Sequence, residues 1–262
     1  MTLTEQNQAQ RKNRLYLILA CIFITNAIIA EFGGVKMFSA EKLLGLLPAH
    51  MNIFGSVVDF NMSVGVLIWP FVFILSDLMN EYFGKKGVRL ISFITAGMIG
   101  YGFLIILGWT KMPPADFWLQ LNGQDSQGRP FDIDFAYSTI FRQGLGIIVG
   151  SLTAFLVSQL VDAYVFHFFR KFTGHRHLWV RATGSTIVSQ LIDSFVILII
   201  AFYLLGNWSL DQVLKVGMVQ YGYKVLLAIF LTPLIYLAHY FIDLYLGKEE
   251  SKLIIEETNQ KW

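Results

Sequence analysis

Long apolar runs recur along the whole chain and are separated by short polar segments. A membrane helix needs about 20 mainly apolar residues to cross the hydrocarbon core, and these runs do not alternate apolar with polar positions as barrel strands do. The run 90–110 contains no charged residue at all. The pattern predicts an all-α bundle of six transmembrane helices, at about 15–30, 62–80, 89–109, 139–166, 182–206 and 216–242.

Two connecting segments are longer than the others. Residues 31–61 keep several apolar residues and are expected to form a short helix at the membrane interface. Residues 111–137 contain several prolines and glycines, which predicts a turn-rich connection outside the cytoplasm. Neither segment is typical of a separate domain, so residues 1–262 are interpreted as one integral-membrane domain. The apolar residues of the first segment include Leu43, Leu44, Leu46 and Leu47.

Lysine and arginine are unequally distributed between the two sets of loops. With six spans, 13 basic residues fall on the side of the N-terminus and 6 on the opposite side. Cytoplasmic loops carry the basic excess in membrane proteins, which predicts that both termini are cytoplasmic. The 13 are Arg11, Lys12, Arg14, Lys85, Lys86, Arg89, Arg170, Lys171, Arg176, Arg181, Lys248, Lys252 and Lys261, and the 6 are Lys36, Lys42, Lys111, Arg129, Arg142 and Lys215.

The composition agrees with a membrane protein and excludes several other classes. Apolar residues make up 55% of the 262 residues, charged residues make up 15%, and the mean hydropathy is +0.56. Soluble domains carry about 25% charged residues, so a soluble globular protein and a disordered chain are excluded. The net charge of +2 gives no reason to expect a nucleic-acid partner. Cys21 is the only cysteine, so no intramolecular disulfide can form.

The usual motifs of nucleotide binding and hydrolysis are absent from the sequence. It contains no GxxxxGK[ST], no HExxH and no GxSxG. His175 and His177 flank Arg176 in a basic loop, which favours a role in membrane orientation over metal binding. We therefore expect no metal, no cofactor and no enzymatic activity.

One polar motif occurs twice within the apolar spans. Ser158-Gln-Leu-Val-Asp-Ala-Tyr164 in the fourth span is repeated as Ser189-Gln-Leu-Ile-Asp-Ser-Phe195 in the fifth, and Ser76-Asp-Leu-Met-Asn-Glu-Tyr82 in the second is a looser relative. Many transporters contain structural repeats with binding groups at the repeat interface. Residues three or four apart share one helix face, which groups Gln159 with Asp162, Gln190 with Asp193, and Asp77 with Asn80 and Glu81.

Two ionisable residues lie deep in the predicted spans. Asp193 is eleven residues into the fifth span and Lys224 is eight residues into the sixth. A charge at the bilayer centre costs about 2.5–3.5 kcal/mol even on the insertion scale. The two residues either form a structural ion pair between neighbouring spans or line a polar cavity that takes a solute. Asp77, Glu81 and Asp162 lie nearer the helix ends, where contact with headgroup water is an equally good explanation.

Small residues recur every four positions along the fourth span and would let another helix approach closely. Packing inside the bundle and a seam between two copies of the chain both explain this pattern. Pro233 in the sixth span and Pro70 in the second are expected to bend their helices, because proline lacks the backbone N–H donor. The small residues are Gly146, Gly150, Ala154 and Ser158.

Four of the spans carry segments that match a known family in order and spacing. The segments are Trp69-Pro-Phe-Val-Phe-Ile-Leu-Ser-Asp-Leu-Met-Asn-Glu-Tyr-Phe-Gly-Lys-Lys-Gly-Val-Arg89, Val157-Ser-Gln-Leu-Val-Asp-Ala-Tyr-Val-Phe-His167, the stretch from His177 to Asp193, and Tyr221-Gly-Tyr-Lys-Val-Leu226 followed by Thr232-Pro233. Together they resemble the queuosine precursor transporter family, which is part of the vitamin uptake transporters. The loops at 31–61 and 111–137 are longer than in compact members of that family.

The resemblance implies import of 7-cyano- and 7-aminomethyl-7-deazaguanine, and of queuine, across the bacterial inner membrane for tRNA modification. A guanine-like base offers two neighbouring N–H donors to a carboxylate, acceptors to an amide or ammonium group, and a flat face to an aromatic ring. Asp193 or Asp77 would then bind the amine edge. The remaining interpretation places Gln190 and Gln159 at the carbonyl edge, Trp69 or Tyr221 under the ring and Lys224 beside a carboxylate, with Asn80, Glu81, Asp162 and Ser189 completing the candidate substrate-binding set.

Three function classes remain open at this point. The first is a self-sufficient carrier for deazapurines, driven by protons, by sodium or by diffusion with metabolic trapping. The second is a substrate-binding membrane subunit that borrows a separate ATPase, for which the small residues from Gly146 to Ser158 are the candidate docking surface. The third is an intramembrane enzyme with Asp162 and Asp193 as a carboxylate dyad, although the two residues lie at different predicted depths.

Overall fold

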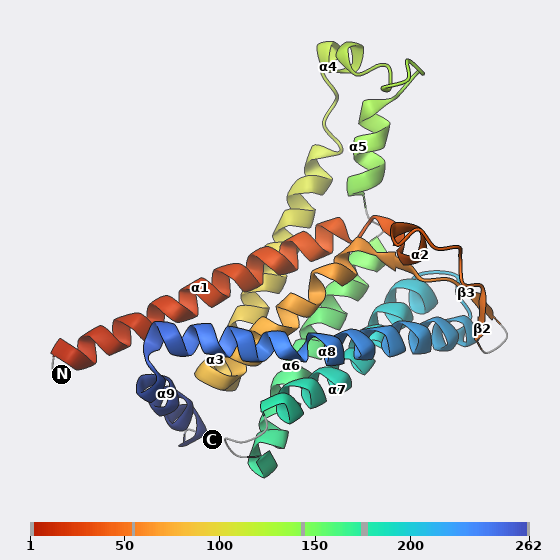
Figure 1. Ribbon diagram of the computed structural model, residues 1–262. Coiled ribbons are helices and arrows are strands. Elements are labelled where there is room, and N and C mark those ends of the chain that lie inside the picture. The colour runs from red at the N-terminus through yellow and green to blue at the C-terminus, as the bar shows by residue number, and fades with distance from the viewer. Residues whose placement is uncertain (1–2, 54–55, 143–144, 174–177, 261–262) are drawn as a thin grey trace.

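The computed structural model of this chain is mostly helical (Figure 1). It describes residues 3–53, 56–142, 145–173 and 178–260. Within those ranges, five helices are long and apolar enough to cross a membrane. The all-α architecture is therefore confirmed, and the chain is a multi-pass membrane protein. The five are α1 (Leu3–Gly33), α3 (Trp69–Trp109), α6 (Leu145–Thr173), α7 (Leu178–Leu198) with its π-helical continuation η2 (Ile199–Leu204), and α8 (Leu210–Leu246).

Helix α3 contains the residues of both the second and the third predicted spans. It is 41 residues long, about twice the length that one crossing needs. Gly84 interrupts it with φ 68° and ψ −177°, a backbone conformation that only glycine adopts without strain. The segments 69–83 and 85–109 on either side run in different directions (Figure 1). The chain therefore reverses at Gly84. The bend expected at Pro70 is absent, because Pro70 lies in the first turn of the helix, where proline is tolerated.

Two membrane helices begin later than the predicted spans. The second span is expected from residue 62, but α3 begins at Trp69, after the 3-10 turn η1 (Val64–Leu67). The fourth span is expected from residue 139, but residues 139–141 belong to the short helix α5 (Ile133–Phe141), and α6 begins at Leu145. In both places an apolar run begins before its membrane helix, because apolar residues also occur in the connecting segments.

Residues 31–61 form more β-structure than helix, contrary to the expected interfacial helix. Strand β1 (Met37–Ser39) pairs antiparallel with β4 (Asn61–Ser63), and β2 (Met51–Ile53) pairs with β3 (Ser56–Val58). Beyond the end of α1, the only helix in the described part of this segment is α2 (Ala40–Leu43), which has four residues and is followed by Leu44, Leu46 and Leu47. Buried Glu41 closes the segment, because its carboxylate accepts the Phe60 backbone N–H at 2.7 Å. We call this side of the protein the β end.

The second long connection projects from the rest of the protein (Figure 1). It contains α4 (Asp116–Leu121), α5 and an isolated bridge between Gln124 and Pro130. At its base, Arg142 donates from Nη2 to the Thr110 carbonyl at 2.8 Å and from Nε to Thr110 Oγ1 at 3.1 Å. The connection is rich in turns, as expected from its prolines and glycines, and it also contains two short helices.

Helix α9 (Lys248–Gln260) folds back beside the start of α1, so both ends of the described chain lie at the same side (Figure 1). Lys12 forms an ion pair with Glu257 at 3.2 Å, and Thr258 Oγ1 donates to the Tyr82 carbonyl at 2.9 Å. Arg170 Nη2 donates to the Ile255 carbonyl at 3.3 Å. We call this side the α9 end. The residues 174–177, with His175, Arg176 and His177, lie outside the described ranges.

Helices α6 and α7 form an antiparallel pair in close contact. A Cβ added to Gly150 would lie 3.1 Å from the Cβ of Ala201 in η2. The face of α6 that carries the small residues therefore packs against another helix of the same chain at this point. Ala154 and Ser158 on the same side are buried. The apolar core continues through α1, α3 and α6, with Phe23 and Phe166 among its fully buried residues.

Candidate functional site

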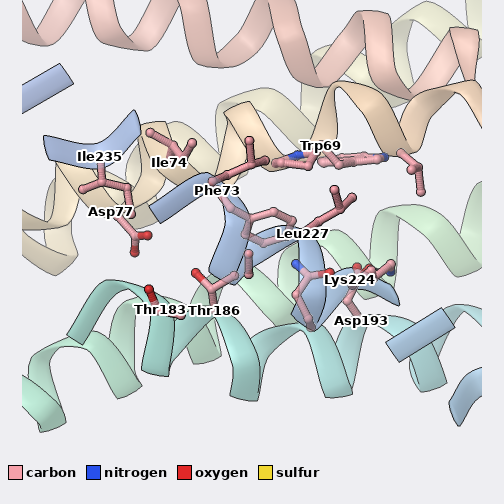
Figure 2. A pocket seen from close by; sticks show the side chains of 15 residues that line it. Trp69, Phe73, Ile74, Asp77, Thr183, Thr186, Asp193, Lys224, Leu227 and Ile235 are labelled. Atoms are coloured by element: carbon pink, nitrogen blue, oxygen red, sulfur yellow. The ribbon is translucent and has the colours of Figure 1, made fainter. Parts of the chain in front are cut away.

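Two connected hollows lie among the long helices. The first, which we call the inner cavity, encloses about 610 Å³ of empty space including its open side. The second, the outer cavity, encloses about 2270 Å³ at the β end. Figure 2 shows the inner cavity. Four residues line both hollows and mark their boundary: Val66, Trp69, Asp193 and Lys224.

Asp193 of α7 and Lys224 of α8 form an ion pair at this boundary. Lys224 Nζ lies 2.6 Å from Asp193 Oδ2, and about a fifth of each side chain is exposed. The predicted ion pair is confirmed, and both residues also line a cavity, whereas binding of a solute there stays a prediction. Pairing offsets the cost of placing each charge within the apolar bundle, while the exposed fraction leaves both groups within reach of a solute.

The inner cavity contains an acceptor and a donor that have no partner within the described residues. Asp77 Oδ1 and Gln190 Nε2 are buried atoms without a hydrogen bond, although both residues line the cavity. Buried polar groups are nearly always hydrogen-bonded in folded proteins. Two unpaired groups in one cavity therefore indicate a site where a polar ligand would complete their bonding.

The cavity walls are largely apolar and aromatic. Trp69 lies at the end nearer the outer cavity, with its ring centroid 5.5 Å from that of Phe155. Phe73, Ile74 and Leu227 continue the wall toward Asp77 (Figure 2). On the facing helix, the Thr186 hydroxyl points toward the Asp77 carboxylate. A flat ligand could therefore contact aromatic rings on its face and polar groups at its edges.

The repeated Ser-Gln-Leu-x-Asp motif forms a reciprocal contact between α6 and α7. Ser189 Oγ donates to Asp162 Oδ1 at 3.1 Å, and Ser158 Oγ, which donates to the Phe155 carbonyl at 3.0 Å, lies 3.5 Å from Asp193 Oδ1. Each serine thus contacts the aspartate of the other copy, as an approximate twofold relation between antiparallel helices would produce. Gln159 lies behind the cavity and accepts the Ser76 hydroxyl at 2.9 Å.

Glu81 lies away from both cavities, in a buried charge cluster near the α9 end. Arg181 donates to it at 2.5 and 3.1 Å, and Arg170 Nη1 lies 3.7 Å from its Oε2. All three side chains are at most 7% exposed. The sequence places these arginines in a loop because they flank apolar runs, whereas the structure places Arg170 in α6 and Arg181 in α7.

The remaining candidates separate into two groups. One group lines the inner cavity: Trp69, Asp77, Gln190, Asp193 and Lys224. The other group does not line it, and includes Gln159, Asp162 and Ser189, which lie behind it. Asn80 also belongs to this second group; it is fully buried, with both amide atoms unpaired within the described ranges. Tyr221 lines neither hollow, while Tyr223 lines the outer one.

Several residues near the site carry no clear sequence signal. Thr183, Thr186 and Phe73 line the inner cavity, and Glu31 lines the outer cavity, where it accepts the Ser151 hydroxyl. The threonines and the phenylalanine are ordinary residues of apolar helices. Glu31 follows the first apolar run, so its position after a span resembles that of a loop residue.

Comparison with known proteins identifies the family. Residues 63–238, more than half of the chain, match the family model described as "Putative vitamin uptake transporter". This range contains every residue that lines the inner cavity. No solved structure matches the chain.

Three curated relatives cover most of the chain. The "Probable queuosine precursor transporter" of Bacillus subtilis (strain 168) is 29% identical over 72% of this chain and 78% of its own. A protein of the same name from Haemophilus influenzae (strain ATCC 51907 / DSM 11121 / KW20 / Rd) is 28% identical over 77% of this chain and 80% of its own. The "Queuosine precursor transporter" of Escherichia coli (strain K12) is 25% identical over 66% and 71%. The chain therefore belongs to the vitamin uptake transporter family, whose members are transporters and not enzymes.

Proposed function

We propose that this protein imports 7-deazaguanine bases, in particular 7-cyano- and 7-aminomethyl-7-deazaguanine, across the inner membrane of a bacterium for tRNA modification. The names of the three relatives support the substrate class. The observation that carries the proposal within this chain is the unpaired acceptor Asp77 Oδ1 and the unpaired donor Gln190 Nε2 in one aromatic-walled cavity.

The chemistry of a guanine-like base fits these groups. Its N1–H and exocyclic amine are neighbouring donors, which one carboxylate such as Asp77 accepts together, while its carbonyl oxygen accepts from an amide such as Gln190. Trp69 and Phe73 offer faces for stacking. Lys224 orients Asp193 at the opening to the outer cavity. The base would therefore lie across the inner cavity, with its polar edges between α3 and α7.

A topology of six crossings with cytoplasmic termini is part of the proposal. The reversal at Gly84 supports counting 69–83 and 85–109 as separate crossings, with η1 lengthening the first. The basic segments also meet in space at the α9 end. Arg11 and Lys12 pair with Glu250 and Glu257, and Arg170 reaches α9. The positive-inside rule then makes the α9 end cytoplasmic, and the outer cavity opens away from the cytoplasm.

Salvage of queuosine tests the proposal. The host should lack both queuosine synthesis and its own importer, express this chain, and receive nanomolar 7-cyano- or 7-aminomethyl-7-deazaguanine. We expect queuosine to reappear in tRNA, and to be lost with Asp193→Asn, because the change removes the charged partner of Lys224 within the path.

Asp211→Asn is the matched control. Asp211 pairs with Lys215 on the same helix as Lys224, but it is 70% exposed and lines neither hollow. Salvage should survive this change. Absence of queuosine with every deazaguanine, despite correct membrane insertion, would contradict the substrate assignment. Uptake by the purified chain in vesicles would separate a self-sufficient carrier from a subunit that needs an ATPase.

A further inference from the structure

Asp77 and Asp162 are two buried acids on neighbouring helices that face the same stretch of a third helix. They come from α3 and α6, which are joined beside them by the hydrogen bond from Ser76 to Gln159 at 2.9 Å. Both face the same stretch of α7, because Asp162 accepts the Ser189 hydroxyl at 3.1 Å and the Thr186 hydroxyl, three positions earlier, points toward Asp77. Asp77 is 2% exposed and Asp162 is fully buried. One oxygen of each, Asp77 Oδ1 and Asp162 Oδ2, has no hydrogen-bond partner in the described part of the chain.

The charged groups on the surrounding helices are already paired with one another. Glu81 on α3 pairs with both Arg170 of α6 and Arg181 of α7, a cluster with two cations for one acid, and the Lys224 ammonium of α8 is bound by Asp193 of α7. Within the described ranges, no lysine, arginine or histidine forms an ion pair with Asp77 or Asp162. Among the described residues, neither Asp77 nor Asp162 therefore has a paired cationic side chain.

Two adjacent carboxylates within an apolar bundle cannot both be ionised at low cost, because they repel each other and have lost their hydration. A bound cation removes this cost. Asn80 supports a ligand at this position, because it shares the face of α3 with Asp77, is fully buried, and has both amide atoms unpaired in the described structure. The amide oxygen and the two carboxylates are all ligands for a hard cation.

We propose that Asp77 and Asp162 together bind one monovalent cation, a proton or a sodium ion, and that this cation drives uptake of the base. The site itself is independent of the substrate, whereas the coupling rests on the function proposed above. The division of roles follows from position. Asp77 lines the inner cavity and faces the ligand, whereas Asp162 lies behind it.

The proximity of the two carboxylates provides the coupling. When the cation neutralises Asp162, Asp77 can stay ionised and accept both N–H donors of the base. Without the cation, an ionised Asp77 faces the charge of Asp162, so the base binds weakly. Cation and base therefore favour each other's binding, and such linkage is reciprocal.

The site is tested first without any substrate, by infrared spectroscopy of the purified full chain. A proton on the pair gives the carbonyl-stretch band of a protonated carboxyl group, whereas sodium shifts the carboxylate bands when it is added. We expect one of these signals in the wild type and its loss in Asp77→Asn/Asp162→Asn, with Asp211→Asn resembling the wild type. If neither signal differs between the wild type and the double variant, the cation site is wrong.

Coupling is tested with labelled 7-cyano-7-deazaguanine, which is uncharged, in vesicles that contain only this protein. A tenfold inward gradient of protons or of sodium should concentrate the base about tenfold if one cation accompanies each base. One gradient should succeed and thereby identify the cation. Asp162→Asn should still exchange labelled for unlabelled base but should fill the vesicles only to the outside concentration.

Two results would overturn the coupling. One is concentrative uptake by Asp162→Asn equal to that of the wild type. The other is a wild type that exchanges base but never concentrates it under either gradient. A wild type that exchanges no deazaguanine would instead contradict the proposed substrate, and the infrared result would still decide the cation site.

Discussion

The two copies of the Ser-Gln-Leu-x-Asp motif have nearly the same sequence but different surroundings. Each serine contacts the aspartate of the other copy, so the local geometry is shared. Asp193 nevertheless meets Lys224 and borders both cavities, whereas Asp162 is fully buried and has no ion-pair partner in the described chain. The same motif therefore provides one neutralised acid and one acid that lacks a counter-charge.

The helix that packs opposite each copy explains this difference. The α7 copy faces α8, which supplies the ammonium group of Lys224. The α6 copy faces α3, which supplies Ser76 to Gln159 and a second carboxylate, Asp77, to Asp162. A polar motif in a membrane helix thus acquires its chemistry from its neighbour, because the apolar surroundings provide no other partner.

The looser third relative of the motif contains the acid with the strongest pairing, and Glu81→Gln is expected to have the largest effect. The change leaves two buried arginines facing a neutral amide, which should cost about 3–5 kcal/mol of stability. Thermal unfolding of the detergent-solubilised protein measures it. Glu249→Gln is the control, because its pair with Lys252 is exposed and contributes little. Equal melting temperatures for both variants would show that the cluster is not stabilising.

Asp193→Asn and Asp162→Asn should differ in their effect on stability, because the two copies of the motif have different partners. The first leaves Lys224 without its partner and should cost about 2 kcal/mol, less than a fully buried pair because both groups are partly exposed. The second removes a buried acid that has no cationic side chain as a partner in the described chain, so the melting temperature should be unchanged or higher. The double variant Asp193→Asn/Lys224→Met should recover most of the loss. Equal destabilisation by the two single variants would refute the difference between the copies.

The two serines provide a finer version of the same comparison. Ser189→Ala removes the donor to buried Asp162 and should cost about 1–2 kcal/mol, because a buried acceptor loses its partner. Ser158→Ala should cost about 0.5 kcal/mol or less, since its 3.5 Å contact is long and Asp193 keeps Lys224. Chemical or thermal unfolding would rank them, and the reverse order would contradict the assigned partners.

Glu41 at the β end lies outside the membrane-spanning helices and serves as a comparison for the acids within them. Its substitution is expected to affect only the stability of the surrounding β end. The Phe60 backbone N–H is the main cause that lowers the pKa of Glu41 from 4.5 to about 2. Because the pKa of Glu41 is lower in the folded protein, ionised Glu41 stabilises the fold at pH values above its ordinary pKa of 4.5. This stabilisation is lost as the pH falls from about 4.5 toward 2. Hydrogen exchange of residues 37–63 should show the loss. In Glu41→Gln, protection should be low at every pH, and acid-dependent opening that persists in this variant would exclude Glu41 as the cause.

The sequence was sufficient to predict the features that depend on the bilayer, namely the membrane helices and the unusual polar residues within them. Apolar runs of sufficient length predict membrane helices because backbone groups in lipid must bond within their own segment. Polar residues inside such runs stand out for the same reason, which is why Asp77, Gln190, Asp193 and Lys224 could be selected before their positions were known. Their shared cavity follows from helix packing and could not be derived from spacing along one helix.

The tertiary structure alone decided which polar groups meet and which residue makes the turn between the second and third predicted spans. Partners such as Glu81 and Arg181 are 100 positions apart, and each is compatible by itself with an ordinary helix end. The reversal at Gly84 depends on a positive φ, which apolar periodicity does not reveal. The sequence determined which segments enter the membrane, since burial in lipid is a property of each segment. Pairing, cavity and charge balance are properties of several helices together, so only their packing could determine them.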